Sequence, residues 1–349
     1  METKMFRIKD EEGEEGLCQA AKILRQGGLV AFPTETVYGL GANALDEEAA
    51  RKIYAAKGRP SDNPLIAHIS SMEELKPLVT EIPEMGRKLA EAFWPGPLTM
   101  VFPKSSQVPR GTTGGLDTVA VRMPAEETAR RLIAMAGVPV AAPSANLSGR
   151  PSPTTAQHVW QDMNGRIDII LDGGPVGIGL ESTIVDVSGD KPVLLRPGAI
   201  TRRMLESVVG NVEIDPAILG KPEENIRPKA PGMKYRHYAP KADLTLVEGK
   251  ERLVVEKINE LVRNETEKGR RAGIICTEET KKSYAQGILR SVGKRSSQET
   301  IAHNLFAVLR EFDDLQVDCI YSESFSRDDL GYAIMNRLTK ASGYRTIYV

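Results

Sequence analysis

Residues 57–64 read KGRPSDNP and bring two cations, an acid and a carboxamide together in one short run. The two prolines restrict the backbone and Gly58 lets it come close to a bound group, so the polar side chains are held rather than free. Lysine and arginine in such a setting bind phosphates and carboxylates. The stretch is therefore either an anion-binding loop or an ordinary polar turn.

The stretch lies between two predicted elements, and a second loop of the same character precedes it. Asp46 caps a predicted helix that runs to about residue 56, and residues 65–69 read as a strand. Residues 33–41, PTETVYGLG, follow a predicted buried strand at 29–32 and combine proline, glycine and polar side chains. We expect the two loops to meet in one anion-binding site.

Length and composition predict a soluble globular protein of two domains. The chain has 349 residues, 41% of them hydrophobic and 27% charged, and a formal net charge of -1. That charge excludes the general basic field of non-specific nucleic-acid binding, so any RNA contact must be local.

Neither export nor a membrane span is predicted. The first residues are acidic and lack an apolar signal core, and no run approaches the roughly 18 apolar residues of a membrane-spanning helix. The 3 cysteines are widely spaced, which fits neither a zinc site nor a disulfide framework. We therefore expect a cytoplasmic protein.

Polar residues recur at the ends of predicted strands in the first part of the chain. Further strands are expected at 98–102, 118–121, 139–142, 184–187 and 193–195, with helices at 17–26, 72–79, 85–93 and 125–136. Cations and small donors adjoin the ends of these strands or lie in the two loops: Lys57, Arg59, Asn63, Arg122, Ser144, Asn146, Ser182 and Arg196. Strand ends are where open α/β sheets display functional side chains, so the joint pattern favours a site.

The last third of the chain reads as a second α/β domain. Residues 213–240 have the composition of a linker, although their last part concentrates aromatic and cationic residues. Strands expected at 244–247, 272–276, 288–292 and 318–321 alternate with helices at 253–267, 300–312 and 332–341. This alternation predicts a small parallel sheet.

Several common chemistries are absent from the sequence. There is no P-loop, and the relaxed dinucleotide fingerprint at 39–44 is disfavoured because Pro33 intervenes after the strand. The 4 histidines are scattered without metal-ligand spacing, and no Gly-x-Ser-x-Gly elbow occurs. The motifs therefore indicate neither a metal held by the protein nor covalent catalysis.

Six segments in order resemble a known family. They are PTETVYGL at 33–40, KGRP with NPL at 57–65, WPGPLT at 94–99, VRMP at 121–124, PSANLSG at 143–149 and ESTI at 181–184. Together they look like the YrdC-type domain of the threonylcarbamoyl-adenylate synthases, over roughly residues 10–210. The segment HYAP at 237–240 and the domain that follows are similar to the two-domain members of that family.

The resemblance implies a fold and a reaction. The fold would be α/β: a YrdC-like twisted open mixed sheet with helices at 1–212, a linker closing over the active site at 213–240, and a smaller Rossmann-like parallel α/β domain at 241–349. The reaction joins L-threonine, bicarbonate or CO2, and ATP into threonylcarbamoyl-AMP, with release of pyrophosphate. The implied cofactor is Mg²⁺ bound through the ATP phosphates. The implied partners are the tRNA threonylcarbamoyl-transferase machinery and, transiently, tRNA.

The family's site residues carry over to matching positions. L-Threonine would be held by Thr36, His68, Arg122, Ala142 and Ser182, with Arg122 taking its carboxylate. ATP would be contacted by Lys57, Arg59, Asn63, Thr118, Ser144, Asn146, Ser152, Arg196, Tyr235 and His237. Lys57 and Arg59 are the catalytic candidates.

Some of these residues have a second interpretation. Tyr235 and His237 would close over the nucleotide, or simply belong to an ordered connector. His68 could instead be a core histidine satisfied by the backbone.

Two other functions compete with the synthase. One is a non-catalytic RNA-binding module built on a YrdC-like domain, which the near-zero net charge disfavours. The other is a carbamoyl-adenylate-forming relative of the hydrogenase maturation type, whose additional zinc and acylphosphatase-like segments have no counterpart in this sequence.

Overall fold

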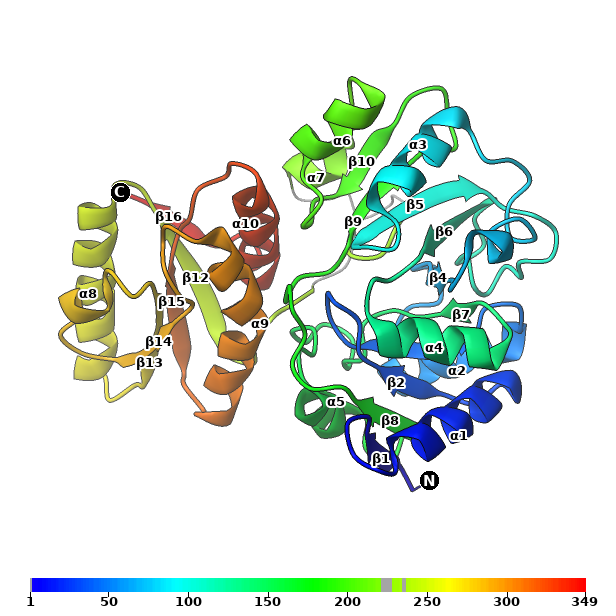
Figure 1. Ribbon diagram of the computed structural model, residues 1–349. Coiled ribbons are helices and arrows are strands. Elements are labelled where there is room, and N and C mark those ends of the chain that lie inside the picture. Colours follow the sequence, from blue (N-terminus) through cyan, green and yellow to red (C-terminus); the bar gives the residue numbers. More distant parts are fainter. Residues whose placement is uncertain (1, 221–227, 234–236) are drawn as a thin grey trace. The chain divides into compact units, whose positions relative to one another are not determined.

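The computed structural model describes residues 2–220, 228–233 and 237–349, which group into two compact units (Figure 1). The first unit holds most residues up to 233, and the second holds those from 237 onward together with Gly149–Pro151 and Ile178–Leu180. The predicted domain boundaries at 212 and 240 stay predictions.

The first unit is built on an 11-stranded mixed sheet, as the sequence predicted. In sheet order its strands are β1 (Lys4–Arg7), β8 (Ile169–Asp172), β2 (Val30–Phe32), β3 (Gly39–Asn43), β7 (Val140–Ala141), β4 (Ile66–His68), β6 (Thr118–Arg122), β5 (Leu98–Pro103), β9 (Thr183–Asp186), β10 (Val193–Arg196) and β11 (Glu213–Ile214). Alternate residues of a strand point to opposite faces, so each strand contributes to two layers.

Helices cover one face of this sheet along most of its length. They are α2 (Glu47–Lys57), α3 (Glu84–Phe93), α5 (Ala156–Met163) and α6 (Arg202–Val209). Their apolar side chains form one buried cluster with alternate strand residues such as Ala67, Met100 and Val121. Asp46 caps α2 by accepting from the Glu48 and Ala49 amides, as predicted from the sequence.

The second face is covered differently at its two ends. Helices α1 (Gly13–Arg25) and α4 (Glu127–Ala136) lie side by side (Figure 1) and bury apolar residues of β2, β7 and β8. Near β10, Ala230 and Met233 complete a small cluster with residues of β4, β5, β6, β9 and β10. On the same face, at the ends of β4, β6 and β5, lie the polar side chains His68, Arg122 and Thr99.

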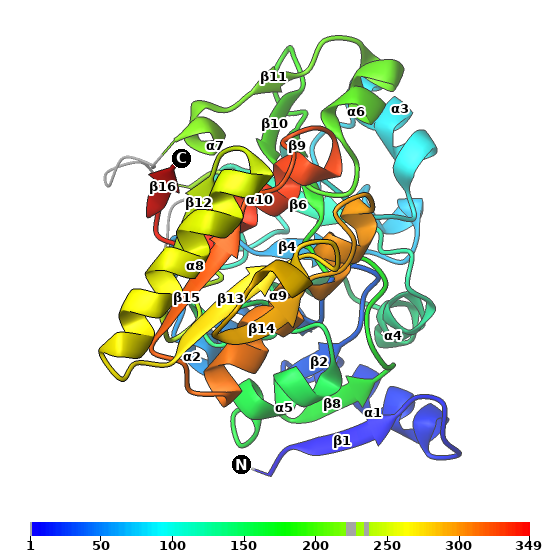
Figure 2. The ribbon, with the colours of Figure 1, turned by 90° about the vertical axis from the view of Figure 1, so that its left-hand side faces the viewer.

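The second unit has the predicted parallel sheet, in the order β14 (Ile288–Ser291), β13 (Ala272–Cys276), β15 (Cys319–Glu323), β12 (Asp243–Glu248) and β16 (Thr346–Tyr348). Helix α8 (Glu251–Glu267) covers one face, and α9 (Gln298–Asp314) and α10 (Leu330–Ala341) cover the other (Figures 1 and 2). Connections leave β13 and β15 in opposite directions, toward β14 and β16 respectively. The carboxyl ends of β13 and β15 thus form the topological switch point of the sheet.

Two local predictions were wrong. The expected helix at 72–79 is one 3-10 turn, Met72–Glu74, because Pro77 lacks the N–H that a continuing helix needs. The second half of loop 33–41 begins strand β3 instead. A Cβ on Gly41 would lie 2.7 Å from Val140 and 2.8 Å from Phe32, so glycine lets this strand pack there.

Several elements were not expected: β1, β8, β11, β16, α5, α6, and a short helix α7 (Pro216–Leu219) within the predicted linker. In the part of the chain that the structure describes, no helix has the length and apolar character needed to cross a membrane.

Candidate active site

One row of the first sheet carries polar side chains across the open part of its second face. His68 of β4 is in register with Arg122 of β6, and Arg122 is in register with Thr99 of β5. Through Ile184 of β9 the row continues to Arg196 of β10. Residues in register on adjacent strands point to the same face, so the sheet itself gathers these side chains.

Arg122 is the most firmly held member of the row. Its Nη1 donates to Thr36 Oγ1 at 2.9 Å, and its Nε donates to the Gly96 carbonyl at 3.3 Å. Its Nη2 lies 2.7 Å from Glu35 Oε1, and the side chain is only 4% exposed. Each Nη nitrogen carries two N–H groups, and the contacts found within the described residues use no more than one on each. The guanidinium is therefore fixed, with donors left for an anion.

Glu35 belongs to this site although sequence reasoning did not select it. Its oxygens are buried, and neither accepts a hydrogen bond of normal geometry from the residues that the structure describes, although the Ala125 backbone lies close enough to act on its pKa. Burial raises the pKa of Glu35, but the Arg122 charge opposes this, and the net pKa is below the usual carboxyl value. The available signal was an acid between Thr34 and Thr36 directly after a buried strand.

His68 is buried beside Arg122 as a neutral ring. Its Nδ1 lies 3.0 Å from the Ile66 carbonyl oxygen, which can only accept, so Nδ1 carries the proton. Burial, followed by the Arg122 charge, lowers the pKa of His68 to about 3. The Ala142 amide donates to the same Ile66 carbonyl at 2.8 Å, which places Ala142 beside the histidine. The backbone thus satisfies one side of the histidine ring and leaves Nε2 as an acceptor.

Ser182 links the row to Arg196. Ser182 Oγ lies 2.7 Å from Thr99 Oγ1, and Arg196 donates to Ser182 through Nη2 to Oγ at 3.1 Å and Nε to the carbonyl at 3.0 Å. Arg196 Nη1 also donates to the Pro231 carbonyl at 3.2 Å. Thr99, which was not predicted as a site residue, completes this group of hydroxyls.

The loop at 57–64 is tied to the loop at 143–149. Lys57 Nζ donates to the carbonyls of Ser144 and Asn146, both at 2.5 Å, and the Ser148 amide donates to the Lys57 carbonyl at 2.9 Å. Gly58 ends helix α2 at a φ of 62°, in the left-handed region that glycine adopts without strain. Gly58 therefore serves the turn, and the Lys57 ammonium holds the neighbouring loop.

Arg59 also bonds within its own loop. Its Nη2 donates to the Pro64 carbonyl at 3.0 Å, and its Nε donates to the Asn63 carbonyl at 3.3 Å. These contacts fix the loop that begins at the end of helix α2, as the prolines suggested.

The loop at 33–41 reaches 143–149 as well. The Ala145 amide donates to the Tyr38 carbonyl at 2.8 Å, and the Leu40 amide donates to the Pro143 carbonyl at 2.8 Å. The two loops of the sequence hypothesis are therefore joined through a third loop.

The other predicted nucleotide residues are more spread out. Ser144 Oγ donates to Asn146 Oδ1, and Ser152 Oγ donates to Glu181 Oε1, each at 2.5 Å. Thr118 begins β6, four residues from Arg122 and hence roughly 13 Å along the strand. Tyr235 lies outside the described residues, and His237 belongs to the second unit. The roles assigned to all of these residues stay predictions.

Comparisons with known proteins identify the family. The family model described as "Telomere recombination" (Sua5, YciO and YrdC) matches residues 22–198, and the model "Threonylcarbamoyl-AMP synthase, C-terminal domain" matches 200–343. A threonylcarbamoyl-AMP synthase of Pyrococcus abyssi is 52% identical over 99% of this chain and 100% of its own length. The chain belongs to the threonylcarbamoyl-AMP synthase family. It is therefore an enzyme of the transferase class, as the sequence predicted.

Other members of the family support the same assignment. A threonylcarbamoyl-AMP synthase of Bacillus subtilis is 50% identical over 95% of this chain and 94% of its own length. The crystal structure of P. abyssi Sua5 complexed with L-threonine superposes with a TM-score of 0.93, at 52% identity and over 100% of both chains. The predicted fold class is confirmed by this likeness.

Proposed function

We propose that this chain forms threonylcarbamoyl-AMP and pyrophosphate from L-threonine, bicarbonate or CO2, and ATP. The observation that carries the proposal is the buried Arg122 guanidinium, fixed by Thr36 and Gly96 with N–H groups to spare. A buried arginine with uncommitted donors suits a carboxylate ligand. Membership of the threonylcarbamoyl-AMP synthases makes L-threonine the expected owner of that carboxylate.

The rest of the polar row would complete the threonine side. Ser182 offers a hydroxyl for the substrate's own hydroxyl or amine, and the neutral His68 ring offers an acceptor at Nε2. Thr36 and the backbone at Ala142 would close the pocket around the amino acid.

The loops around Lys57 would form the nucleotide side. No covalent enzyme intermediate is needed, because the carbamate oxygen of threonylcarbamate attacks the α-phosphorus of ATP and pyrophosphate leaves. Catalysis then consists of positioning the two anions and stabilising charge on phosphorus, for which Lys57 and Arg59 are our candidates. The remaining contacts to ATP would come from Asn63, Thr118, Ser144, Asn146, Ser152, Arg196, Tyr235 and His237.

Magnesium fits this arrangement as a substrate-borne ion. The described side chains proposed for the phosphates are cations, hydroxyls and amides rather than carboxylates. Mg²⁺ commonly binds through substrate phosphates and waters with few protein ligands. When bound with ATP it would neutralise phosphate charge, while the protein residues position the reacting groups.

Beyond the reaction we propose a pathway and a cellular place. Tyr235 and His237 would close over the nucleotide and exclude water from the labile adenylate. The product would pass to the tRNA threonylcarbamoyl-transferase machinery, with at most a transient contact between this chain and tRNA. The proposed location is the cytoplasm.

Pyrophosphate release tests the proposal. The chain is incubated with ATP, Mg²⁺, bicarbonate and one amino acid at a time, with controls that omit bicarbonate or amino acid. We expect release that depends on both L-threonine and bicarbonate. The absence of release with any amino acid would favour the RNA-binding module, and release that depends on a different amino acid would change the substrate.

A further inference from the structure

The proposed function gives the threonine ammonium group hydrogen-bonding neighbours, the Ser182 hydroxyl among them, but no group that takes up its proton. Arg122 would bind the substrate carboxylate, but the amine must lose a proton before its nitrogen can attack a carbonate carbon. Glu35 is the carboxylate nearest to this point in the described part of the chain, with Oε1 2.7 Å from Arg122 Nη2. Its oxygens are buried and accept no hydrogen bond of normal geometry from the described residues, although the Ala125 backbone is close enough to lower the pKa of Glu35.

The geometry of an α-amino acid fits an adjacent cation and anion. Its ammonium and carboxylate are attached to the same carbon, so groups that recognise both must themselves be neighbours. The Arg122 and Glu35 side chains meet this requirement, since they lie 2.7 Å apart. Thr36, which follows Glu35 in the chain, holds Arg122 from the other side at 2.9 Å.

The other titratable and charged groups near this point are poor proton acceptors. Arg122 of β6 is the charged side chain that acts most strongly on Glu35, and His68 of β4 is within its electrostatic reach. Arginine cannot accept a proton, and burial lowers the pKa of His68 to about 3. Lys57 and Arg59 are themselves cations.

We propose that Glu35 binds the threonine ammonium group and accepts its proton, which makes it a catalytic residue for carbamate formation. This inference rests on the proposed function. The amine lone pair then attacks the bicarbonate carbon, the bond from carbon to the bicarbonate hydroxyl breaks, and that hydroxide leaves with a second amine proton as water. The products are threonylcarbamate, water and protonated Glu35, so atoms and charge balance.

Threonine binding would itself prepare Glu35 for this role. In the free enzyme the Arg122 charge favours the ionised carboxylate. A bound threonine carboxylate shares that guanidinium and adds a like charge nearby, and both effects raise the proton affinity of Glu35. Burial acts in the same direction.

Replacing Glu35 by glutamine tests the proposal. The variant Glu35→Gln keeps the side-chain size but cannot accept the proton. We expect threonine-dependent pyrophosphate release at about pH 7 to fall roughly 100-fold or more, the usual scale of general-base catalysis. The reverse reaction, formation of ATP from threonylcarbamoyl-AMP and pyrophosphate, needs no amine deprotonation before phosphoryl transfer and should change only a few-fold.

A pH series separates a base from a structural residue. The amino group of a free amino acid is protonated at neutral pH, so the forward rate of Glu35→Gln should rise about tenfold per pH unit while the ammonium form predominates, whereas the wild-type rate rises less. The matched control is Glu47→Gln, which removes a carboxylate bonded to the Gly111 amide elsewhere in the first unit and should behave as wild type.

Each outcome decides the matter. Equal loss in both directions without recovery at high pH would assign Glu35 to pocket structure and overturn the proposal, as would a forward rate equal to wild type. If Glu35→Gln does not fold, Glu35→Asp keeps the carboxylate and should retain the wild-type pH dependence at a lower rate. Failure of wild type to release pyrophosphate with threonine would instead refute the proposed function.

Discussion

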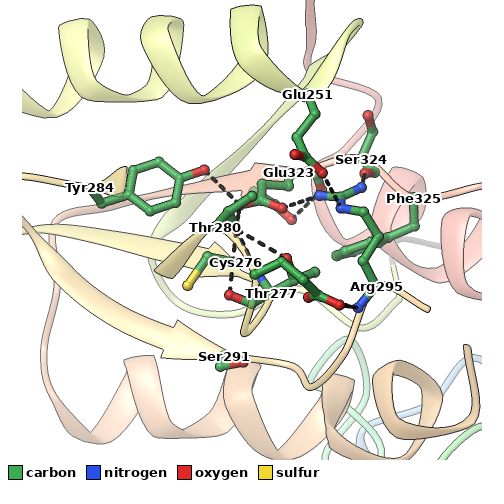
Figure 3. Close-up of polar contacts among 12 residues, drawn as sticks. Glu251, Cys276, Thr277, Thr280, Tyr284, Ser291, Arg295, Glu323, Ser324 and Phe325 are labelled. Carbon is green, nitrogen blue, oxygen red and sulfur yellow. Dashed lines mark hydrogen bonds and ion pairs between the residues drawn. The ribbon is translucent and has the colours of Figure 1, made fainter. Parts of the chain in front are cut away.

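Each of the two units has an arginine paired with a glutamate whose carboxylate oxygens are buried, but the two pairs differ in their further partners. In the first unit Arg122 pairs with Glu35, and neither group uses all of its hydrogen-bonding capacity within the described residues. In the second unit Arg295 pairs with Glu323, and both are surrounded by further partners (Figure 3). We interpret the first pair as open to a ligand, and the second as one whose surroundings are already occupied by side chains of the protein.

The Arg295–Glu323 pair lies at the carboxyl end of strand β15. Glu323 ends β15, is fully buried, and accepts from Tyr284 at 2.7 Å and from Thr280 on the same oxygen. Arg295 contacts its other oxygen, lies 2.9 Å from Glu251, and donates to the Ser324 carbonyl at 3.1 Å (Figure 3). Burial, reinforced by the Glu323 charge, raises the pKa of Cys276 to about 12 and also raises that of Tyr284.

This arrangement bears on the role of the second domain. The carboxyl ends of β13 and β15 are the switch point at which open α/β sheets bind ligands. Here the same position is occupied by side chains that bond to one another, although Arg295 Nε, 2.9 Å from Glu251, makes no hydrogen bond of normal geometry among the described residues. We therefore interpret the Glu323 network as a set of contacts that stabilises the surrounding loops, and the Arg122 pair as a binding site.

The largest expected effect comes from removing the guanidinium of the open pair. Arg122→Lys keeps the charge but loses the forked donors that hold Thr36 and a substrate carboxylate. Losing such a pair typically costs about 2–5 kcal/mol, which corresponds to roughly 30-fold to several thousand-fold in threonine binding. Calorimetric titration with L-threonine measures this, and a change under about threefold would remove Arg122 from the site.

The closed pair should matter for stability instead. Glu323→Ala leaves Arg295 without its buried partner, so we expect a loss of about 3–5 kcal/mol in the free energy of unfolding. Hydrogen exchange of β13 and β15 amides reports on this directly. An unchanged exchange rate would mean that the network contributes little to the fold.

Arg59 tests the division between the two substrate sides. Arg59→Ala removes a cation from the proposed nucleotide wall and should weaken ATP use about tenfold or more, as expected for a charge-assisted hydrogen bond worth about 1.5–3 kcal/mol. The KM for threonine should change far less. Equal loss for both substrates would show that the loop shapes the whole pocket.

For His68 we expect a smaller effect, on how the free energy of unfolding depends on pH. Its pKa of about 3 in the folded chain is below the unfolded value near 6.5, so the unfolded chain binds more protons between these values and acid favours unfolding. Between pH 6.5 and 5 this costs about 2 kcal/mol at most. Denaturant titrations should show a flatter pH dependence for His68→Gln, and an identical slope would exclude this contribution.

The sequence predicted which polar residues lie at strand ends, but not which residues pair with them across the sheet. Arg122 and Ser182 were predictable because polar residues beside buried strands are displayed at the edge of a sheet. Glu35 was not, because its partner Arg122 is distant in the sequence and no local pattern names a partner across a sheet. The alternation of strands and helices predicted the second domain.

Lys57 shows the same limit within a loop. The sequence suggested an ammonium facing phosphates, whereas the structure has it donating to the carbonyls of Ser144 and Asn146. The residue type predicts the charge of Lys57 and the number of hydrogen bonds that its ammonium can donate. The folded structure decides which acceptors receive those hydrogen bonds. Its proposed action on ATP therefore stays a prediction.

The comparison of the two pairs can be tested most directly by one binding measurement. L-Threonine and threoninamide, which lacks the carboxylate charge, are titrated into wild type and into Glu323→Gln, with folding checked by circular dichroism. The account predicts that threonine binds both proteins with similar affinity and that threoninamide binds each at least about 30-fold more weakly. Equal affinity for the two ligands in wild type would contradict the claim that Arg122 recognises the carboxylate.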